Sequence, residues 1–263
     1  MCSAMINSQS EFAGKRALVT GGTQGIGKSI ARRLARNGAR VYLNYAHNRQ
    51  AAQDTLDEFN SLGYMAELCQ ADLSQPPEIE KMLDSVHQSG PLDFLVCNAS
   101  YQEKKSFFET DLVLLQRTLD INICANFLVI QRVAREMVQA KRPGRMVICS
   151  SGHGTLVFQN TFAYDVSKAG LDHFMRNAAL ELIEHGIRLN AVAIGWTHTP
   201  GERRWFSEED QNRLSRGIPI GRAADADEMA AALEFLLSDA ASYIVGTLMV
   251  ADGGFLLRPN PNT

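Results

Sequence analysis

Residues 16–45 read RALVTGGTQGIGKSIARRLARNGARVYLNY, and this stretch decides the fold class. Two short apolar segments flank a glycine-rich turn and a segment with helical periodicity, which ends at about Asn37 and is closed by Gly38. Short strands rich in Val and Leu that alternate with helical segments are typical of βαβ units with a parallel sheet. The stretch therefore predicts a strand, a helix and a second strand parallel to the first.

The same alternation continues along the chain. Further strands are expected at 65–70, 94–98, 145–150, 187–194 and 247–254. Helices are expected to end at 60–62 and to span 76–87, 111–123, 127–140, a segment from about 162, and 225–237. Residues 124–126 are expected to separate two of these helices. We therefore expect an α/β fold with one doubly wound parallel sheet of about seven strands, buried on both faces by helices.

The chain contains no internal repeat and no linker rich in Pro or Ser, which favours a single domain. Residues 1–13 are expected to form a flexible leader, and 14–263 the domain. The irregular stretch 195–222 carries Trp196, Trp205 and Phe206 among charged residues. Loops of this length in compact domains are often functional, so a lid is expected at about 196–221.

Composition excludes several functional classes. The 263 residues carry a net charge of −3, so no overall basic field favours nucleic acid. No uninterrupted apolar run approaches the roughly 20 residues that span a bilayer, and the first residues do not resemble a secretion signal. The five cysteines are scattered and the six histidines show no ligand spacing, so neither a disulfide framework nor a metal site is expected. These features favour a cytoplasmic protein.

The glycine-rich turn follows the first predicted strand and opens the first predicted helix. Glycines there let the backbone approach a pyrophosphate, which would rest at the positive N-terminus of the helix. The spacing is G-x-x-x-G-x-G, and the strand–turn–helix context favours a dinucleotide. The residues of the turn expected to contact it are Gly21, Thr23, Gln24, Gly25, Ile26 and Gly27.

Tyr164 and Lys168 lie four residues apart in a segment expected to be helical, with Ser150 and Ser151 upstream. Spacing i to i+4 places the phenol and the ammonium on one face, one turn apart. A nearby cation favours the ionised phenol, which can then exchange a proton with an oxygen near neutral pH. Such a pair can also be two residues of a solvated helix face, and it becomes informative only beside a hydride carrier.

Together these motifs resemble the short-chain dehydrogenase/reductase family, over residues 15–254. The resemblance rests on the glycine turn, Asn98-Ala99 after the fourth strand, Ser151, and Tyr164-x-x-x-Lys168. It implies a Rossmann-like sheet and an enzyme that transfers hydride between a nicotinamide cofactor and a carbonyl carbon. It also implies a homotetramer, assembled through the middle helices and the C-terminal strand.

The resemblance also assigns roles to four residues. Tyr164 would supply the proton, Lys168 would favour the ionised tyrosine and reach the nicotinamide ribose, and Ser151 would hydrogen-bond the substrate oxygen. Asn122, in LDINI, would hold a water that connects Lys168 to solvent. Further cofactor contacts implied by the resemblance are Asp72, Leu73, Asn98, Ala99, Ser100, Tyr164, Lys168, Gly195, Thr197 and Thr199.

Two segments depart from the family pattern. The family's N-N-A-G is Cys97-Asn98-Ala99-Ser100 here, and its P-G after the sixth strand is Ile194-Gly195. Gly195 preserves a close approach to the nicotinamide, whereas loss of the proline loosens that turn. Neither departure touches the acid–base residues.

The end of the second strand bears on the cofactor. Relatives specific for NAD carry an aspartate there, whereas this chain has Tyr45 followed by His47, Asn48 and Arg49. The absence of a carboxylate and the presence of donors favour NADP(H), with some use of NAD(H). Gln24 argues in the other direction, because many NADP-dependent relatives carry a basic residue there.

We therefore expect an NADP(H)-dependent ketoreductase or alcohol dehydrogenase. The alternatives are an enoyl reductase, whose specialised members space the tyrosine and lysine more widely, and a nucleotide-binding regulator without turnover. The substrate is a small carbonyl compound or alcohol of unspecified identity. His153 is either an exposed loop residue or a substrate contact.

Overall fold

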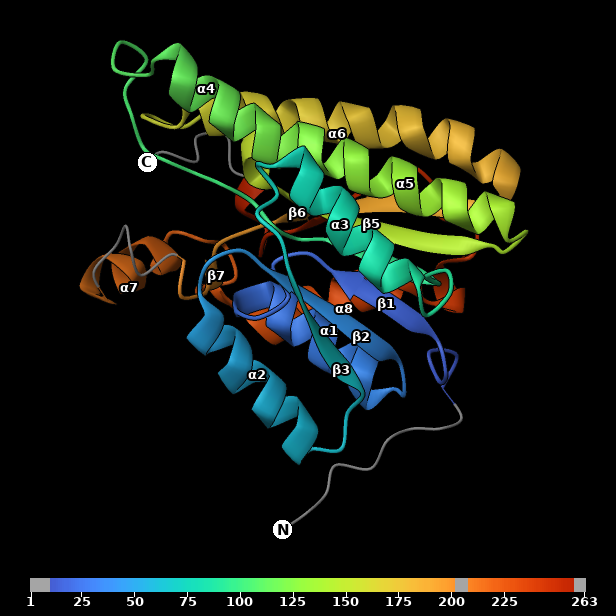
Figure 1. The fold of residues 1–263 in the computed structure, drawn as a ribbon. Coiled ribbons are helices and arrows are strands. Elements are labelled where there is room, and N and C mark those ends of the chain that lie inside the picture. Colours follow the sequence, from blue (N-terminus) through green and yellow to red (C-terminus); the bar gives the residue numbers. More distant parts are fainter. Residues whose placement is uncertain (1–9, 202–207, 258–263) are drawn as a thin grey trace.

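The computed structural model describes residues 10–201 and 208–257. A single seven-stranded sheet with the order β3-β2-β1-β4-β5-β6-β9 organises the chain (Figure 1), and every neighbouring pair is parallel. This confirms the expected fold class. The strands are β1 (Arg16–Val19), β2 (Arg40–Tyr45), β3 (Ala66–Gln70), β4 (Phe94–Cys97), β5 (Gly144–Ser151), β6 (Ile187–Ile194) and β9 (Leu248–Ala251).

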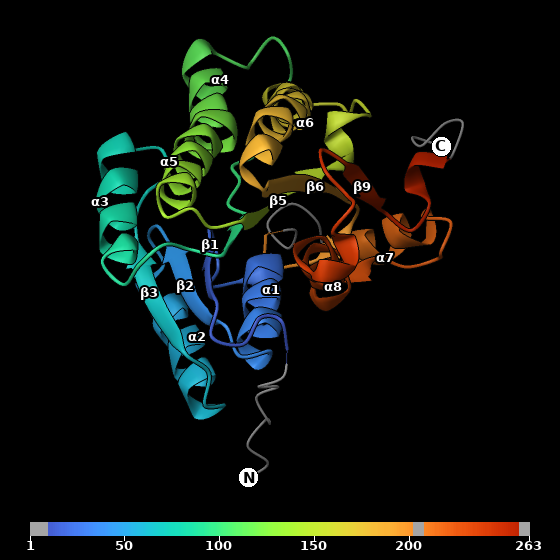
Figure 2. The ribbon, with the colours of Figure 1, turned by 90° about the vertical axis from the view of Figure 1, so that its right-hand side faces the viewer.

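Helices cover both faces of the sheet, as Figures 1 and 2 show. One face is packed by α3, α5 and α6, and the other by α1, α2 and α8. The helices are α1 (Gly25–Arg36), α2 (Arg49–Ser61), α3 (Pro76–His87), α4 (Leu112–Leu119), α5 (Ala125–Gln139), α6 (Phe162–Leu182), α7 (Glu208–Arg216) and α8 (Ala226–Leu237). Both cores are built from the Val-, Leu- and Ile-rich strands, which explains why these strands show no polar alternation.

The expected break between the two middle helices is absent. A π-helical turn, Asp120–Cys124, joins α4 to α5, so the helix runs without interruption from Leu112 to Gln139. By length and apolar content alone this helix could span a membrane, a criterion that the core helix of a soluble protein also meets. In this structure it lies beside α3 and α6 on one face of the sheet (Figure 2).

The start of the described chain is packed against the domain. Phe12 is 4% exposed and its ring lies 5.1 Å from that of Phe94 in β4. Glu11 pairs with Arg145 at 2.5 Å. Residues 10–13 therefore belong to the folded domain and not to a leader, whereas residues 1–9 of the predicted leader lie outside the described part.

The stretch expected to form a lid has more regular structure than its sequence suggests. Two short strands, β7 (Thr197–His198) and β8 (Ala224–Asp225), pair in parallel and join its two ends. Helix α7 lies between them in the chain and stands apart from both helical layers (Figure 1). Trp205 and Phe206 lie outside the described residues, so their predicted role in the lid has no structural description.

The strand order reverses between β1 and β4, because the chain first proceeds outward to β3 and then returns. In open α/β sheets, ligands bind beyond the carboxyl ends of the strands at such a reversal. Thr20 and Asn98 follow β1 and β4 at this place. The topology therefore positions the glycine turn and Asn98 side by side.

Candidate active site

Tyr164 and Lys168 lie one turn apart on α6, as their spacing predicts. The Lys168 ammonium lies 5.4 Å from the centroid of the Tyr164 ring. Its side chain is buried, at 2% exposure, and Nζ donates a hydrogen bond to the Cys149 carbonyl at 3.0 Å. A buried, tethered ammonium does not fit the alternative of two residues on a solvated face.

Ser151 ends β5 and is nearly buried. Its Oγ accepts a hydrogen bond from the backbone N–H of His153 at 3.3 Å. The His153 ring in turn lies edge-on to the Tyr164 ring, with 5.0 Å between the centroids. The structure therefore brings Ser151, His153, Tyr164 and Lys168 into one continuous group of contacts.

Asn122 is fully buried inside the π-helical turn. Its Oδ1 accepts from Tyr101 N at 2.8 Å and Ser100 Oγ at 3.3 Å, and its Nδ2 donates to Tyr101 O and Ser167 Oγ, both at 2.9 Å. An amide side chain offers two acceptor and two donor positions, and all four are occupied. The side-chain amide is therefore fully occupied and ties the loop after β4 to α6, so a water held by Asn122 would bind its backbone carbonyl, which accepts one hydrogen bond, from Asn126 Nδ2.

Sequence reasoning missed a buried carboxylate two turns along α6 from Tyr164. Asp172 accepts a short hydrogen bond from Ser150 Oγ. Burial raises the pKa of Asp172 above its ordinary value, and the Ser150 hydrogen bond and the charge of Lys168 partly offset this. The signal was available, because 164, 168 and 172 form one i, i+4, i+8 stripe.

The glycine turn is tied to the strand that ends beside it. Asn98 Nδ2 donates to the carbonyls of Thr20 and Gly21 at 3.0 and 3.1 Å. A Cβ on Gly27 would lie 2.2 Å from the Gly21 carbonyl oxygen, so only glycine fits at this position. Sequence reasoning missed Asn44, whose Oδ1 accepts from Gly21 N at 3.2 Å.

The N-terminus of α1 fits an anionic ligand. Its first turn contains no acidic residue, and the N-cap residue Gln24 makes no capping hydrogen bond with its side chain. The first amide groups of a helix lack partners within the helix, and the helix dipole favours negative charge at this end. These groups suit the pyrophosphate of a dinucleotide, together with Gly25, Ile26 and Gly27.

The three polar residues after β2 differ in their interaction partners. His47 Nε2 lies 3.3 Å from the Asp72 carboxylate, and Asn48 caps α2 by accepting from Ala51 N at 3.1 Å. Arg49 is exposed at the start of α2 and forms no ion pair with a described residue. Arg49 is thus the cation that remains open to an anion here.

Asp72 lies near the start of the loop between β3 and α3. Burial opposes its ionisation, but hydrogen bonds from Ser74 and the charge of His47 outweigh burial, and the pKa of Asp72 is lowered. Two further predicted cofactor contacts, Thr23 and Leu73, are buried. Tyr45 is half-buried, and its hydroxyl lies 3.4 Å from Gln70 Oε1. The backbone N–H of Ala99 donates to Thr20 Oγ1 at 3.1 Å.

The segment after β6 returns to the glycine turn. A Cβ on Gly25 would lie 3.6 Å from the Thr199 side chain. Gly195 packs against the backbone of Asp252, since a Cβ there would lie 2.5 Å from the Asp252 Cα. Glycine at 195 is therefore explained by packing and is no independent sign of a cofactor. The Thr197 hydroxyl donates to the Gly195 carbonyl at 3.0 Å.

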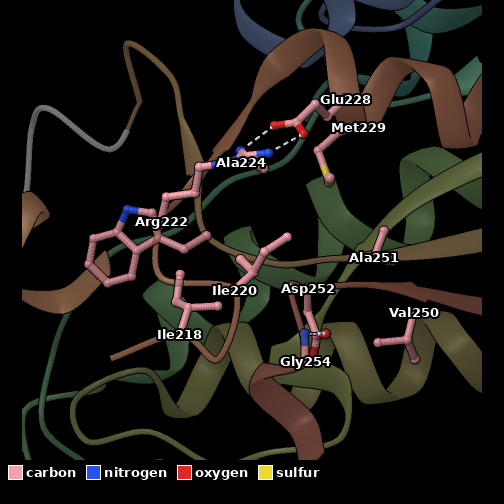
Figure 3. A pocket seen from close by; sticks show the side chains of 12 residues that line it. Ile218, Ile220, Arg222, Ala224, Glu228, Met229, Val250, Ala251, Asp252 and Gly254 are labelled. Atoms are coloured by element: carbon pink, nitrogen blue, oxygen red, sulfur yellow. Dashed lines mark hydrogen bonds and ion pairs between the residues drawn. The ribbon is translucent and has the colours of Figure 1, made fainter. Parts of the chain in front are cut away.

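A cavity of about 250 Å³ lies beside this segment (Figure 3). Its walls include Ile218, Ile220, Met229 and Val250, and Arg222 forms an ion pair with Glu228 at one side. None of the four predicted catalytic residues lines it. It is therefore separate from the group around Tyr164. Among the described residues, no cluster of His, Cys, Asp or Glu could hold a metal ion.

This chain is similar in sequence and in fold to several known oxidoreductases. A family model described as enoyl-(acyl carrier protein) reductase matches residues 21–256. The 3β-hydroxysteroid dehydrogenase 1 of Eggerthella lenta is 32% identical over 95% of this chain and 96% of its own length. The NADP(+)-dependent L-rhamnose 1-dehydrogenase of Thermoplasma acidophilum is 30% identical over 94% and 98%. A 7α-hydroxysteroid dehydrogenase, solved with NADH and 7-oxo glycochenodeoxycholic acid, superposes with a TM-score of 0.88 at 30% identity, covering 97% of both chains.

Proposed function

Because the chain belongs to the short-chain dehydrogenase/reductase family and is an oxidoreductase acting on CH–OH and C=O groups, we propose that it uses NADP(H) and that Tyr164 is its general acid/base. The observation that carries the proposal is the buried Lys168 ammonium 5.4 Å from the Tyr164 ring. A fixed cation beside the phenol stabilises negative charge that develops on it while a proton is exchanged with a substrate oxygen.

Bound at the glycine turn, the nicotinamide cofactor would supply or accept a hydride. The chain's own residues would hold it through Gly21 and the uncapped amides at the start of α1, and through Asp72, Asn98 and Thr199 around the reversal of the sheet. These positions suit a dinucleotide because backbone donors and small residues meet there.

Ser151 is suited to hold the substrate oxygen. Its Oγ already accepts a hydrogen bond from the His153 backbone N–H, so its own proton is available for donation. A donor aimed at the oxygen stabilises negative charge as that charge develops. Tyr164 then gives its proton to the same oxygen during reduction and takes it back during oxidation.

Asn122 is a positioning residue in this proposal and does not touch the reacting atoms. Its amide joins the backbone of Tyr101 to the Ser167 hydroxyl, next to Lys168 in the chain. We infer that it fixes the distance between the loop after β4 and α6, and thereby the place of the lysine.

The preference for NADP(H) follows from the end of β2. No carboxylate is present at Tyr45 to repel a 2'-phosphate, and Arg49, which forms no ion pair within residues 10–201 and 208–257, is a cation nearby. His47 contributes less than its sequence position suggests, because Asp72 lies 3.3 Å away. A kcat/KM for NADH above that for NADPH would contradict this preference, and Arg49→Gln should lower the NADPH value selectively.

The test of the acid/base assignment is Tyr164→Phe. Removing the proton donor should lower kcat by roughly 10²- to 10⁴-fold, while NADPH binding measured by fluorescence titration survives. Tyr243→Phe, on a fully exposed tyrosine, is the matched control and should retain wild-type activity. A Tyr164→Phe enzyme with a tenth of wild-type turnover would rule out the assignment.

An enoyl reductase is the second candidate, and the description of the matching family model favours it. The two relatives described above are dehydrogenases of a hydroxysteroid and of L-rhamnose, which favours oxidation of an alcohol. NADPH consumption with a trans-2-enoyl thioester, set against ketones and sugars, separates the two reactions. A nucleotide-binding regulator would show no turnover in either assay.

We propose a homotetramer in the cytoplasm. The long helix and α6 carry apolar side chains that the single chain leaves exposed, namely Leu112, Val113, Phe127, Val138, Phe162, Val166 and Leu180. An apolar face on this scale suits an interface between subunits. Light scattering after gel filtration measures the mass directly, and a monomer of 29.0 kDa would contradict the proposal.

A further inference from the structure

His153 and Asp165 form a hydrogen-bonded pair beside Tyr164. Nδ1 of His153 lies 2.5 Å from Oδ1 of Asp165, in the first turn of α6. The other carboxylate oxygen accepts from Phe158 N and Thr161 Oγ1, both at 3.0 Å. Asp165 is thus buried, with three hydrogen-bond donors directed at it, and its position is fixed independently of the substrate.

The hydrogen-bond partners of Asp165 determine the tautomer of His153. An ionised carboxylate only accepts hydrogen bonds, so Nδ1 carries the proton that faces it. In the neutral imidazole the second nitrogen, Nε2, then holds a lone pair. No described residue hydrogen-bonds to Nε2, and the His153 side chain is 23% exposed to solvent. A hydrogen-bond acceptor of fixed orientation is therefore available.

Packing also holds the ring against the proposed reaction site. The Phe158 ring lies 4.2 Å from the His153 ring by centroid, and Tyr164 lies 5.0 Å away edge-on. The backbone of His153 binds Ser151 Oγ, which we have assigned to the substrate oxygen. The imidazole is thus held beside the two residues that we assign to the substrate oxygen, Ser151 and Tyr164.

We propose that His153 Nε2 accepts a hydrogen bond from a second hydroxyl of the substrate, adjacent to the reacting carbon. The substrate class is then a vicinal diol or its α-hydroxy carbonyl product, including aldoses, and not a simple secondary alcohol. Asp165 is a positioning residue, which sets the tautomer of His153 and does not touch the substrate. This inference rests on the proposed alcohol dehydrogenase activity of the same site.

The experiment compares matched alcohols with NADP⁺. The pairs are cyclohexanol with 1,2-cyclohexanediol and 2-butanol with 2,3-butanediol, and the readout is the ratio of kcat/KM for diol over mono-alcohol. An enzyme with the proposed acceptor should prefer the diols at least about tenfold, because one added hydrogen bond to a fixed partner has that order of effect.

Two variants test the assignment of atoms. His153→Asn keeps a donor in the place of Nδ1 and removes the acceptor at Nε2, so the diol ratio should fall about 10- to 100-fold. Asp165→Asn presents an amide to Nδ1, which shifts the imidazole proton to Nε2 and should lower the same ratio. His185→Asn, at an exposed histidine beyond the far end of α6, is the control and should keep the wild-type ratio.

Three results would overturn the inference: an unchanged ratio in His153→Asn, a wild-type enzyme that prefers mono-alcohols or turns over no diol, or a preference for hydroxy acids. The last result would indicate an imidazolium that donates to an anion. Failure of the proposed function is distinguishable: either the wild-type enzyme oxidises neither the diol nor the mono-alcohol of any pair, or Tyr164→Phe keeps a tenth or more of wild-type turnover whatever the ratio.

Discussion

Gly27→Ala is the sharpest test of the glycine turn. The new Cβ would lie 2.2 Å from the Gly21 carbonyl oxygen and 2.5 Å from Asn98 Nδ2. Contacts of this kind are essentially never shorter than 3.0 Å, so the turn must move by about 0.8 Å. Both neighbours are constrained, since Asn98 Nδ2 also hydrogen-bonds to the Thr20 carbonyl. Overpacking of this kind costs about 1–3 kcal/mol, which lowers Tm by roughly 2–12 °C for a chain of this size.

The larger effect should be on cofactor affinity. The displaced carbonyl belongs to the turn that we propose cradles the pyrophosphate, so the Kd for NADPH should rise at least about tenfold. Fluorescence titration measures it, and differential scanning fluorimetry without cofactor measures the stability. Gly63→Ala is the matched control: with φ at +77° it carries backbone strain, but no atom lies within 4 Å of its Cβ. It should lose stability and keep wild-type affinity, and unchanged affinity in Gly27→Ala would refute the reasoning.

Three further predictions concern other parts of the chain. Burial raises the pKa of Cys69 and Cys149 to about 12, so iodoacetamide at pH 8 should label neither thiol in the native protein. Mass mapping of the labelled peptides checks this. Labelling of Cys149 as fast as in urea would contradict the prediction. The hydrogen bond from Arg222 lowers the pKa of Glu228 to about 2. This pair therefore stabilises the fold above pH ~4.3 and loses effect as pH falls toward 2, so Arg222→Met should lower Tm slightly at pH 7 and less at pH 3. Phe12→Ala should cost about 3–5 kcal/mol in urea unfolding, because the ring is buried against the sheet, and a cost below about 1 kcal/mol would contradict that packing.

Much of the fold follows from local sequence. The strands are continuous apolar runs, and α3 begins at Pro76 and ends at His87 as its pattern predicts. Contacts between residues far apart in the chain could not be predicted from local sequence. Phe12 is an isolated aromatic residue without periodic neighbours, so only the structure shows that it packs on Phe94. The pairing of β7 with β8 rests on two residues in each strand, too few for a pattern.

For the candidate site, spacing predicted the Tyr164–Lys168 pair because both residues lie on one helix. The partners of His153 and Asn122 were not predictable, since Asp165 and Tyr101 reach them through tertiary structure. The role expected of Asn122 came from resemblance alone. Only a count of its hydrogen bonds could show that the amide has no free position.

The π-helical turn at 120–124 makes the site sensitive to chain length in a way that composition does not reveal. The turn holds one residue more than an α-helical turn and keeps the faces of α4 and α5 in phase, whereas an insertion or deletion in the α-helical parts on either side would rotate one half of the helix by roughly 100° against the other. Asn122 would then face away from Ser167, or the apolar stripe of α5 would leave the sheet. Conservative exchanges along this helix should be tolerated far more readily than any single-residue insertion or deletion.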